Sequence, residues 1–266
     1  MKIGIVGAAG RMGRMLIKQI AETQGCTLVG GTEREGSPLL GHDLGLLGGG
    51  AAVGVVATSD VKAVFDVADV VIDFTVPAAT RAHAKLAAET GTAMVIGTTG
   101  LTPEDLDEIR AASRKAAIVQ SFNMSLGVNL LANLVERAAA ALGPDAFDIE
   151  IVEMHHKHKI DAPSGTAILL GEAAAKGREV NLAEVTQSGR HGETGARRSG
   201  DIGFAALRGG DVVGEHTVIL AGAGECIELT HRATQRAIFA AGGVRAAQWL
   251  EGREPGLYSM KDVLGL

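Results

Sequence analysis

The first 125 residues alternate between short apolar segments and helix-like segments, and this alternation limits the possible folds more than any other feature. The apolar segments lie at residues 2–6, 27–32, 53–58, 69–75, 92–100 and 117–125. Strands that alternate with helices form a parallel sheet covered on both faces. Aromatic residues make up only 3% of the chain, so the core must be aliphatic, which suits buried parallel strands. The sequence therefore predicts an α/β fold with a doubly wound parallel sheet.

A glycine-rich turn follows the first apolar segment. Residues 7–13, GAAGRMG, separate it from a helical pattern that runs through residues 15–20. A strand, a glycine turn and a helix are the context of a dinucleotide-binding fingerprint, in which the helix N-terminus faces a pyrophosphate. The glycines here occupy the first, fourth and seventh positions, which differs from the usual G-x-G-x-x-G. A purely structural turn is the alternative, but the residues that follow favour cofactor binding.

An acidic and a basic residue, Glu33 and Arg34, end the second apolar segment. A carboxylate about 20 residues beyond the glycines is placed to accept hydrogen bonds from the adenosine ribose. The neighbouring guanidinium could hold the 2′-phosphate of NADP. Such a pair is often only a solvated turn, but its distance from the glycines favours a role in cofactor binding.

Glycine, threonine and small polar residues recur where the apolar segments end. In a parallel sheet these carboxyl ends lie along one edge, where ligands of doubly wound folds bind. The segments that collect there are Gly7–Met12, Thr75, Gly97–Thr99 and Ser121–Met124. Their collection at one edge predicts a cofactor-binding cleft.

Residues 153–166, EMHHKHKIDAPSGT, combine three histidines and two lysines with a turn that opens a helix. Lysines and a helix N-terminus attract anions, and histidines exchange protons near neutral pH. This pattern favours a small anionic substrate that takes up a proton. A solvated loop is the alternative for the cluster alone. A metal site is disfavoured, because the lysines would repel a divalent cation and no cysteine lies nearby.

The second half of the chain predicts a smaller α+β domain. A helix is expected over residues 125–142, a strand over 148–154 and a helix over 166–176. Antiparallel strands are expected at 203–208, 212–221 and 226–233, and a helix at 234–251. Residues 35–52 and 186–203 are interpreted as loops. We expect residues 1–126 and 234–266 to form a discontinuous dinucleotide-binding domain, and residues 127–233 to form the second domain.

Charge and composition disfavour several classes of partner. The net charge of −6 argues against non-specific nucleic-acid binding. No apolar run approaches the length of a membrane-spanning helix, and the N-terminus lacks the pattern of a signal peptide. Cys26 and Cys226 show no metal or redox spacing and are interpreted as reduced thiols. We therefore expect a soluble, cytoplasmic protein that binds neither nucleic acid nor membranes.

Several of these segments closely resemble the 4-hydroxy-tetrahydrodipicolinate reductase family, also called dihydrodipicolinate reductases, of bacterial lysine and diaminopimelate biosynthesis. They span nearly the whole chain, and HHKHKIDAPSGTA is the most specific of them. The others are VGAAGRMGR, EREGS, VIDFT, VIGTTG and GEHT. The resemblance implies a Rossmann-like cofactor domain, a second domain for substrate binding and tetramerisation, a homotetramer, and reduction of a cyclic dicarboxylate by NADH or NADPH.

The resemblance also implies roles for individual residues. His155 would be the proton donor and Lys159 a second donor or substrate anchor. His156, Gly165 and Thr166 would contact the substrate, Glu33 the ribose hydroxyls and Arg34 the NADP phosphate. The residues that would line the cofactor are Gly7, Ala8, Ala9, Gly10, Arg11, Met12, Gly97, Thr98, Thr99, Ser121, Phe122, Asn123 and Met124. No metal is implied.

Two alternatives to this reductase function stay open at the level of the sequence. One is another NAD(P)-dependent amino-acid or imine dehydrogenase of similar architecture. The other is an interaction protein that senses dinucleotides without catalysis. Loss of NADPH in the presence of the predicted substrate would distinguish the three.

Overall fold

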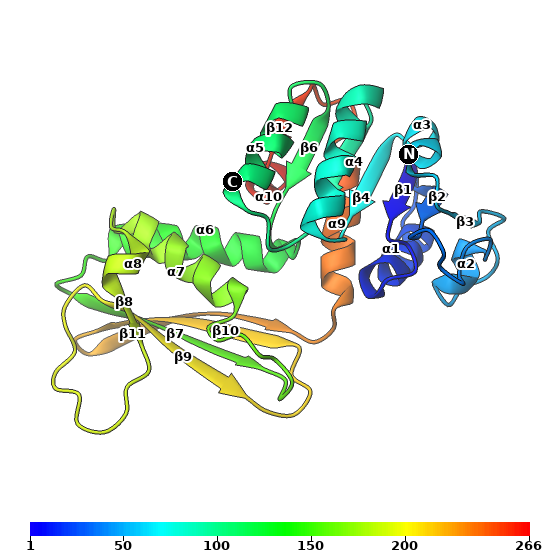
Figure 1. Ribbon diagram of the computed structural model, residues 1–266. Helices are drawn as coiled ribbons and strands as arrows, with labels where there is room; N and C mark the ends of the chain where they lie inside the picture. Colours follow the sequence, from blue (N-terminus) through cyan, green and yellow to red (C-terminus); the bar gives the residue numbers. More distant parts are fainter. The chain divides into compact units, whose positions relative to one another are not determined.

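The computed structural model describes residues 1–266, which divide into two compact units (Figure 1). The first unit comprises Met1–Leu126 and Ala237–Leu266, and the second comprises Gly127–Arg236. The chain thus returns to the first unit at residue 237, whereas the sequence suggested residue 234. None of the helices is both long enough and apolar enough to span a membrane.

The first unit is built on a seven-stranded sheet in which all pairings are parallel. The strand order is β12-β6-β5-β4-β1-β2-β3. The order reverses between β1 and β4, which makes their carboxyl ends the expected place for a ligand. The predicted doubly wound sheet is confirmed. Its strands are β1 (Lys2–Val6), β2 (Thr27–Thr32), β3 (Ala57–Thr58), β4 (Val70–Asp73), β5 (Ala93–Ile96), β6 (Ala117–Gln120) and β12 (Gly256–Tyr258).

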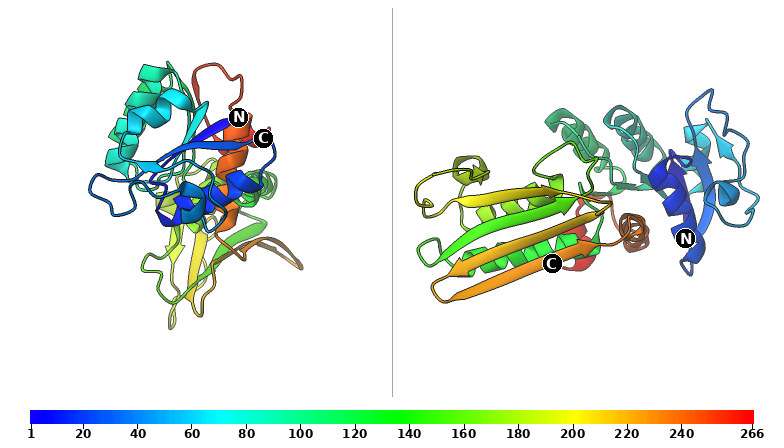
Figure 2. Two further views of the ribbon diagram at one scale, coloured as in Figure 1. Left: turned by 90° about the vertical axis from the view of Figure 1, so that its right-hand side faces the viewer. Right: turned by 90° about the horizontal axis from the view of Figure 1, so that it is seen from below.

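Helices cover both faces of this sheet (Figures 1 and 2). One face packs against α1 (Arg11–Glu22), α9 (Ala237–Trp249) and α10 (Met260–Leu264). The other packs against α3 (Val61–Val67), α4 (Pro77–Thr90) and α5 (Pro103–Ala112). Neighbouring residues of β4 alternate between the two cores, as the two-residue period of a strand requires. The helix α3 and the strand β12 were not predicted.

The segment 35–58 differs most from the sequence expectation in this unit. It contains a short helix, α2 (Leu44–Leu47), and only Ala57 and Thr58 of the expected strand 53–58 pair with β2. The reason is Asp43, whose carboxylate caps α2 and accepts the backbone N–H groups of Val53 and Gly54. These donors are therefore withdrawn from the sheet.

The second unit contains a mixed five-stranded sheet in the order β11-β10-β7-β9-β8. Strand β10 pairs antiparallel with β7 and β11, but β9 runs parallel to β7. The expectation that residues 203–208 form an antiparallel strand was therefore wrong, because β9 lies on the far side of β7 from β10. The strands are β7 (Phe147–His155), β8 (Thr186–Ser188), β9 (Ile202–Arg208), β10 (Gly214–Gly222) and β11 (Glu225–Ala233).

Helices cover only one face of this second sheet. The helices α6 (Leu126–Ala141) and α7 (Gly165–Gly177) lie along it, with the short α8 (Leu182–Val185) at one end (Figure 1). The core contains Ile149 and Ile151 of β7, Leu170 of α7, and Val218 and Leu220 of β10. Seen from below, the strands lie in front of the helices, and no element covers their opposite face (Figure 2, right).

Candidate active site

Two polar residues lie at the buried end of β7. Glu153 is only 1% exposed and His155 is 9% exposed. They are two residues apart on one strand, so both point to the face that packs against the helices. His155 is thus the last residue of the strand rather than part of the following loop. A buried carboxylate and a buried imidazole in an aliphatic core must be held by polar partners.

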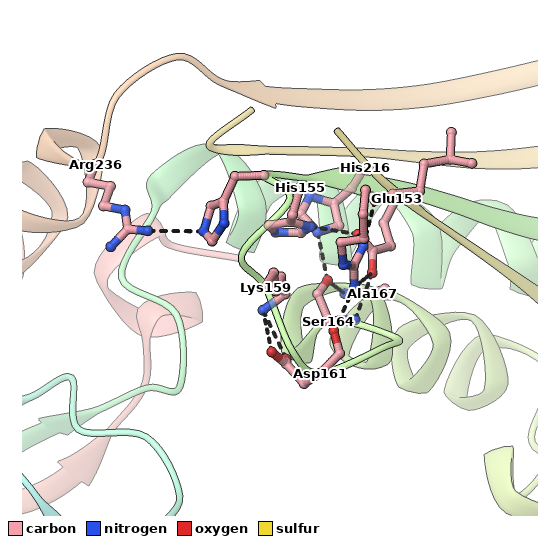
Figure 3. A network of polar contacts seen from close by, with 11 residues as sticks. Glu153, His155, Lys159, Asp161, Ser164, Ala167, His216 and Arg236 are labelled. Carbon is pink, nitrogen blue, oxygen red and sulfur yellow. Dashed lines mark hydrogen bonds and ion pairs between the residues drawn. The ribbon is translucent and has the colours of Figure 1, made fainter. Parts of the chain in front are cut away.

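The carboxylate of Glu153 receives hydrogen bonds from three elements (Figure 3). Arg208 of β9 forms a forked pair with it, with N–O distances of 2.8 and 2.9 Å. The Nδ1 atom of His155 lies 2.6 Å from Oε2, and the backbone N–H of Ser164 donates to Oε1 at 3.0 Å. Burial opposes ionisation of Glu153, but the hydrogen bonds from Arg208 and His155 outweigh it and hold the pKa of Glu153 below its ordinary value.

A second histidine, His216 of β10, lies directly opposite Glu153 in the sheet. Its ring stands edge-on to that of His155, with 5.1 Å between centroids, and its Nε2 lies 3.0 Å from Ser164 Oγ. Burial, reinforced by the electrostatic influence of His155, lowers the pKa of His216 to about 4. His216 is therefore neutral at physiological pH. Ser164 also caps α7, since its Oγ accepts the N–H of Ala167 at 3.2 Å.

The loop after β7 carries the remaining cationic groups. Lys159 forms an ion pair with Asp161, with both N–O distances at 2.9 Å (Figure 3). This hydrogen bond from Lys159 holds the pKa of Asp161 below its usual range. Burial, reinforced by the charge of Arg236, lowers the pKa of His156, whose Nε2 accepts from Arg236 at 3.3 Å.

An open cavity of ≈ 570 Å³ lies beside this loop. Its lining residues are His156, Lys157, His158, Gly210, Asp211 and Arg236. The first turn of α7 begins at Gly165, close in sequence to the same loop, and the Ala162–Pro163 peptide bond before it is cis. Cationic side chains and a helix N-terminus suit an anionic ligand. No group of three or more His, Cys, Asp or Glu side chains is placed to hold a metal ion.

In the first unit, the glycine turn after β1 has the geometry of a phosphate-binding turn. Gly7 has a φ of +70°, and a Cβ at Gly13 would lie 2.4 Å from the carbonyl oxygens of Gly7 and Ala8. Gly10 occupies the N-cap of α1 and provides no side chain to accept from the first turn. The N–H groups of that turn can therefore face a diphosphate, so the residues present fit a dinucleotide.

Glu33 lies against this turn, since its Oε1 accepts the backbone N–H of Ala9 at 2.9 Å. Arg34 beside it is exposed. One carboxylate oxygen of Glu33 thus helps to hold the turn, and the second is available to a ligand. The two residues lie next to the glycine turn, as their spacing in the sequence suggested.

The segment Gly97–Thr99 is held by a buried polar cluster centred on Asp73. The carboxylate of Asp73 accepts from the hydroxyls of Thr75 and Thr98, at 2.6 and 3.2 Å, and lies 2.8 Å from His83 Nδ1. Thr98 is 2% exposed, so its side chain points into the protein and only its backbone faces the sheet edge. A Cβ at Gly97 would lie 2.4 Å from the ring of Phe74.

The segment Ser121–Met124 follows β6, and some of its side chains are buried whereas others are exposed. Ser121 Oγ donates to the carbonyl of Asn123 at 2.8 Å, and Phe122 is 53% exposed. Met124 is 1% exposed and packs in the core, so its side chain is not available to a ligand. The segment can therefore offer the Phe122 ring and backbone groups.

Several residues at these sites were missed by the sequence analysis: Glu153, Arg208, His216, Arg236, Asp73 and His83. A signal for Glu153 was present, because residues two apart on a strand share a face. Arg208 and His216 come from elements far along the chain, and only the strand register brings Arg208 opposite His155 and His216 opposite Glu153.

Comparison with known proteins gives consistent matches over the full chain. The family model described as dihydrodipicolinate reductase, N-terminus, matches residues 1–124, and that described as dihydrodipicolinate reductase, C-terminus, matches residues 127–264. A 4-hydroxy-tetrahydrodipicolinate reductase of Brucella abortus (strain 2308) is 58% identical over 266 residues, which cover 100% of this chain and 99% of the relative. One from Parvibaculum lavamentivorans is 59% identical and is covered to 98%.

Solved structures show the same fold. A dipicolinate-bound dihydrodipicolinate reductase from Paenisporosarcina sp. TG-14 superposes with a TM-score of 0.78, at 23% identity and with 97% of each chain covered. An amine dehydrogenase from Mycobacterium smegmatis superposes less closely, with a TM-score of 0.59 at 14% identity over 97% of this chain and 94% of that one.

Proposed function

Because this chain belongs to the dihydrodipicolinate reductase family, it is an NAD(P)H-dependent oxidoreductase, and we propose that His155 is the proton donor of its reaction. The family activity is reduction of 4-hydroxy-tetrahydrodipicolinate, by way of dihydrodipicolinate, to tetrahydrodipicolinate in lysine and diaminopimelate biosynthesis. The observation that carries the assignment is a buried imidazole at the end of β7, next to a cationic loop and a helix N-terminus.

The substrate is a cyclic imine with two carboxylates, and the second unit offers groups for each. Lys159 and the N-terminus of α7 at Gly165 and Thr166 bind carboxylate oxygens through charge and backbone N–H groups. The lowered pKa of His156 favours its neutral form near pH 7, and the neutral ring can form a hydrogen bond with the ligand. The ring nitrogen, conjugated to the double bond, accepts electron density during reduction, and His155 supplies the proton that completes it. General acid catalysis of this kind contributes about 10²- to 10⁴-fold.

The cofactor supplies the hydride when it is bound. The glycine turn Gly7–Met12, the backbone of Gly97–Thr99 and the segment Ser121–Met124 would line it, with Glu33 at the ribose hydroxyls. Two observations support this placement: a Cβ at Gly13 or Gly97 would clash with neighbouring atoms, and the N-terminus of α1 has no side-chain cap. Arg34 is exposed beside Glu33 and offsets its charge, which supports use of both NADH and NADPH.

The uncovered face of the second sheet supports self-association, and the homotetramer implied by the resemblance is the state we propose. Apolar side chains project from this face, and Leu207 is 50% exposed. The others on the same face, by strand alternation and register, are Val152, Met154, Ala205 and Ile219.

A biosynthetic enzyme that consumes NAD(P)H is proposed to act in the cytoplasm, together with the other enzymes of its pathway.

An assay that follows loss of NADPH absorbance tests the proposed reaction directly. The unstable substrate is generated enzymatically in the cuvette, and NADH is tested in parallel. Consumption that depends on the substrate supports the reductase. Consumption only with other imines or amino acids would assign a different dehydrogenase, and cofactor binding without turnover would indicate a sensor.

A further inference from the structure

The two oxygens of the Glu153 carboxylate are each occupied by two donors. Arg208 Nη1 and His155 Nδ1 donate to Oε2, and Arg208 Nη2 and the Ser164 N–H donate to Oε1. All four donors contact the side chain of Glu153, which is 1% exposed. Only an ionised carboxylate satisfies four donors, because an amide would present its own N–H groups to two of them. The arrangement is therefore specific for glutamate in its charged form.

This carboxylate determines which nitrogen of His155 carries a proton. Since Glu153 only accepts, the Nδ1 of His155 must donate, and the neutral ring is held as the Nδ1–H tautomer. Protons are then gained and lost at Nε2. Gly214 lies on that side, where a Cβ would come within 3.0 Å of Nε2, so the absence of a side chain leaves this nitrogen open.

Arg208 ties this carboxylate to the substrate loop. The forked pair fixes the plane of the Glu153 carboxylate, and Nη2 also donates to the backbone carbonyl of Asp161 at 2.6 Å. Asp161 is the residue that pairs with Lys159. The groups around His155 thus come from its own strand (Glu153), from β9 (Arg208) and from β10 (His216), while Lys159 of the loop acts electrostatically on His216.

We propose that Glu153 and Arg208 are a positioning pair for His155, holding its Nδ1–H so that Nε2 delivers the proton and the imidazolium is stabilised by a fixed anion. This inference rests on the proposed role of His155 in the reduction. Glu153 is 1% exposed and Arg208 is bound to it, so the pair acts through His155. His216 closes the other side of the ring as a neutral group, so the anion of Glu153 acts on His155 without a competing charge on β10.

The tautomer of His155 can be measured on the wild-type protein. Uniform ¹⁵N labelling and long-range ¹H–¹⁵N correlation spectra distinguish Nδ1–H from Nε2–H imidazoles, and a His155→Gln variant identifies the signal. We expect the neutral His155 to carry its proton on Nδ1. A neutral His155 protonated on Nε2 would overturn the proposal. This readout does not depend on turnover, so it stands whether or not the proposed reaction is found.

Kinetics of Glu153→Gln test the catalytic consequence. We expect kcat to fall about 10²- to 10⁴-fold, the range of general acid catalysis, while the dissociation constants of NADH and NADPH stay unchanged. Glu136→Gln is the matched control, because Glu136 of α6 lies in the same unit and pairs with Lys176 at the far end of α7 from His155. It should keep wild-type kcat.

A wild-type kcat in folded Glu153→Gln would contradict the proposal. Glu153→Asp, which keeps the charge but shortens its reach, should recover part of the lost turnover. If Glu153→Gln does not fold, the tautomer measured in the wild-type protein decides the question. Loss of turnover in His155→Gln together with full turnover in Glu153→Gln would leave the reductase function intact and remove the positioning pair.

Discussion

At the scale of single residues, we propose that the adjacent opposite charges of Glu33 and Arg34 determine how the adenosine end of the cofactor is bound. Glu33 holds the turn through Ala9 and can accept from ribose hydroxyls, but its charge opposes a 2′-phosphate. Arg34 is exposed and free to swing toward that phosphate. From this pair of opposite charges we propose that the site binds both NADH and NADPH rather than selecting one.

Arg34→Ala should weaken NADPH binding and leave NADH nearly unchanged. Hydrogen bonds to charged groups contribute about 1.5–3 kcal/mol, which is about 10- to 150-fold in affinity. Solvent and salt will reduce the effect at an exposed site. Titration of both cofactors at two salt concentrations measures it. Equal losses for NADH and NADPH would mean that Arg34 does not contact the phosphate.

The buried, neutral His216 should make the protein less stable in mild acid. Its pKa is about 4 in the folded protein and 6.5 ordinarily, so the unfolded chain binds the proton first as the pH falls. The stability that neutral His216 contributes is fully present above pH 6.5 and is lost as the pH falls from 6.5 to about 4. Glu153, whose folded pKa is also lowered, adds a further loss of stability at still lower pH. Between pH 7 and pH 5 we expect a loss of about 2 kcal/mol from His216.

Urea unfolding at these two pH values measures the change in the free energy of unfolding. In His216→Gln the difference between pH 7 and pH 5 should shrink by the amount that His216 contributes. An undiminished difference in this variant would show that other groups cause the acid sensitivity.

At the scale of elements, the strands and helices with strong periodicity were predictable and the polar clusters were not. β1, β2, α1, α6 and α7 lie within a few residues of their predicted bounds, because each combines an apolar period with a glycine or cap. By contrast, β9 was placed in the wrong pairing, since its parallel partner β7 lies about 50 residues earlier and no local turn records that pairing. The placement of Arg208 and His216 around Glu153 depends on the same kind of long-range register.

The contact between α1 and β1 should fail if Gly13 gains a side chain. In Gly13→Ala the new Cβ would lie 2.4 Å from two carbonyl oxygens, so α1 must move away from the glycine turn. We expect NADH and NADPH affinities to fall together, unlike the selective effect of Arg34→Ala. Gly143→Ala is the control, because no atom lies within 4 Å of a Cβ there. Unchanged affinity for both cofactors in Gly13→Ala would contradict the placement of the pyrophosphate.

At the scale of the whole molecule, one sheet has both faces covered and the other has a face without helices (Figure 2). A charge added among the apolar side chains of that face should weaken the proposed self-association. Leu207→Glu is expected to shift the proposed tetramer to smaller species, measured by light scattering after size-exclusion chromatography. Val67→Glu is the control, since Val67 is equally exposed, at 50%, at the end of α3 in the other unit. A tetramer that survives Leu207→Glu would place the interface elsewhere.

The central claim is that His155 donates the proton in an NAD(P)H-dependent reduction of the cyclic dicarboxylate. Turnover of His155→Gln, set against its NADPH affinity measured by fluorescence titration, tests it most directly. General acid catalysis predicts that kcat falls by about 10²- to 10⁴-fold while the NADPH dissociation constant stays at its wild-type value. A His155→Gln variant that turns over at the wild-type rate would contradict the account.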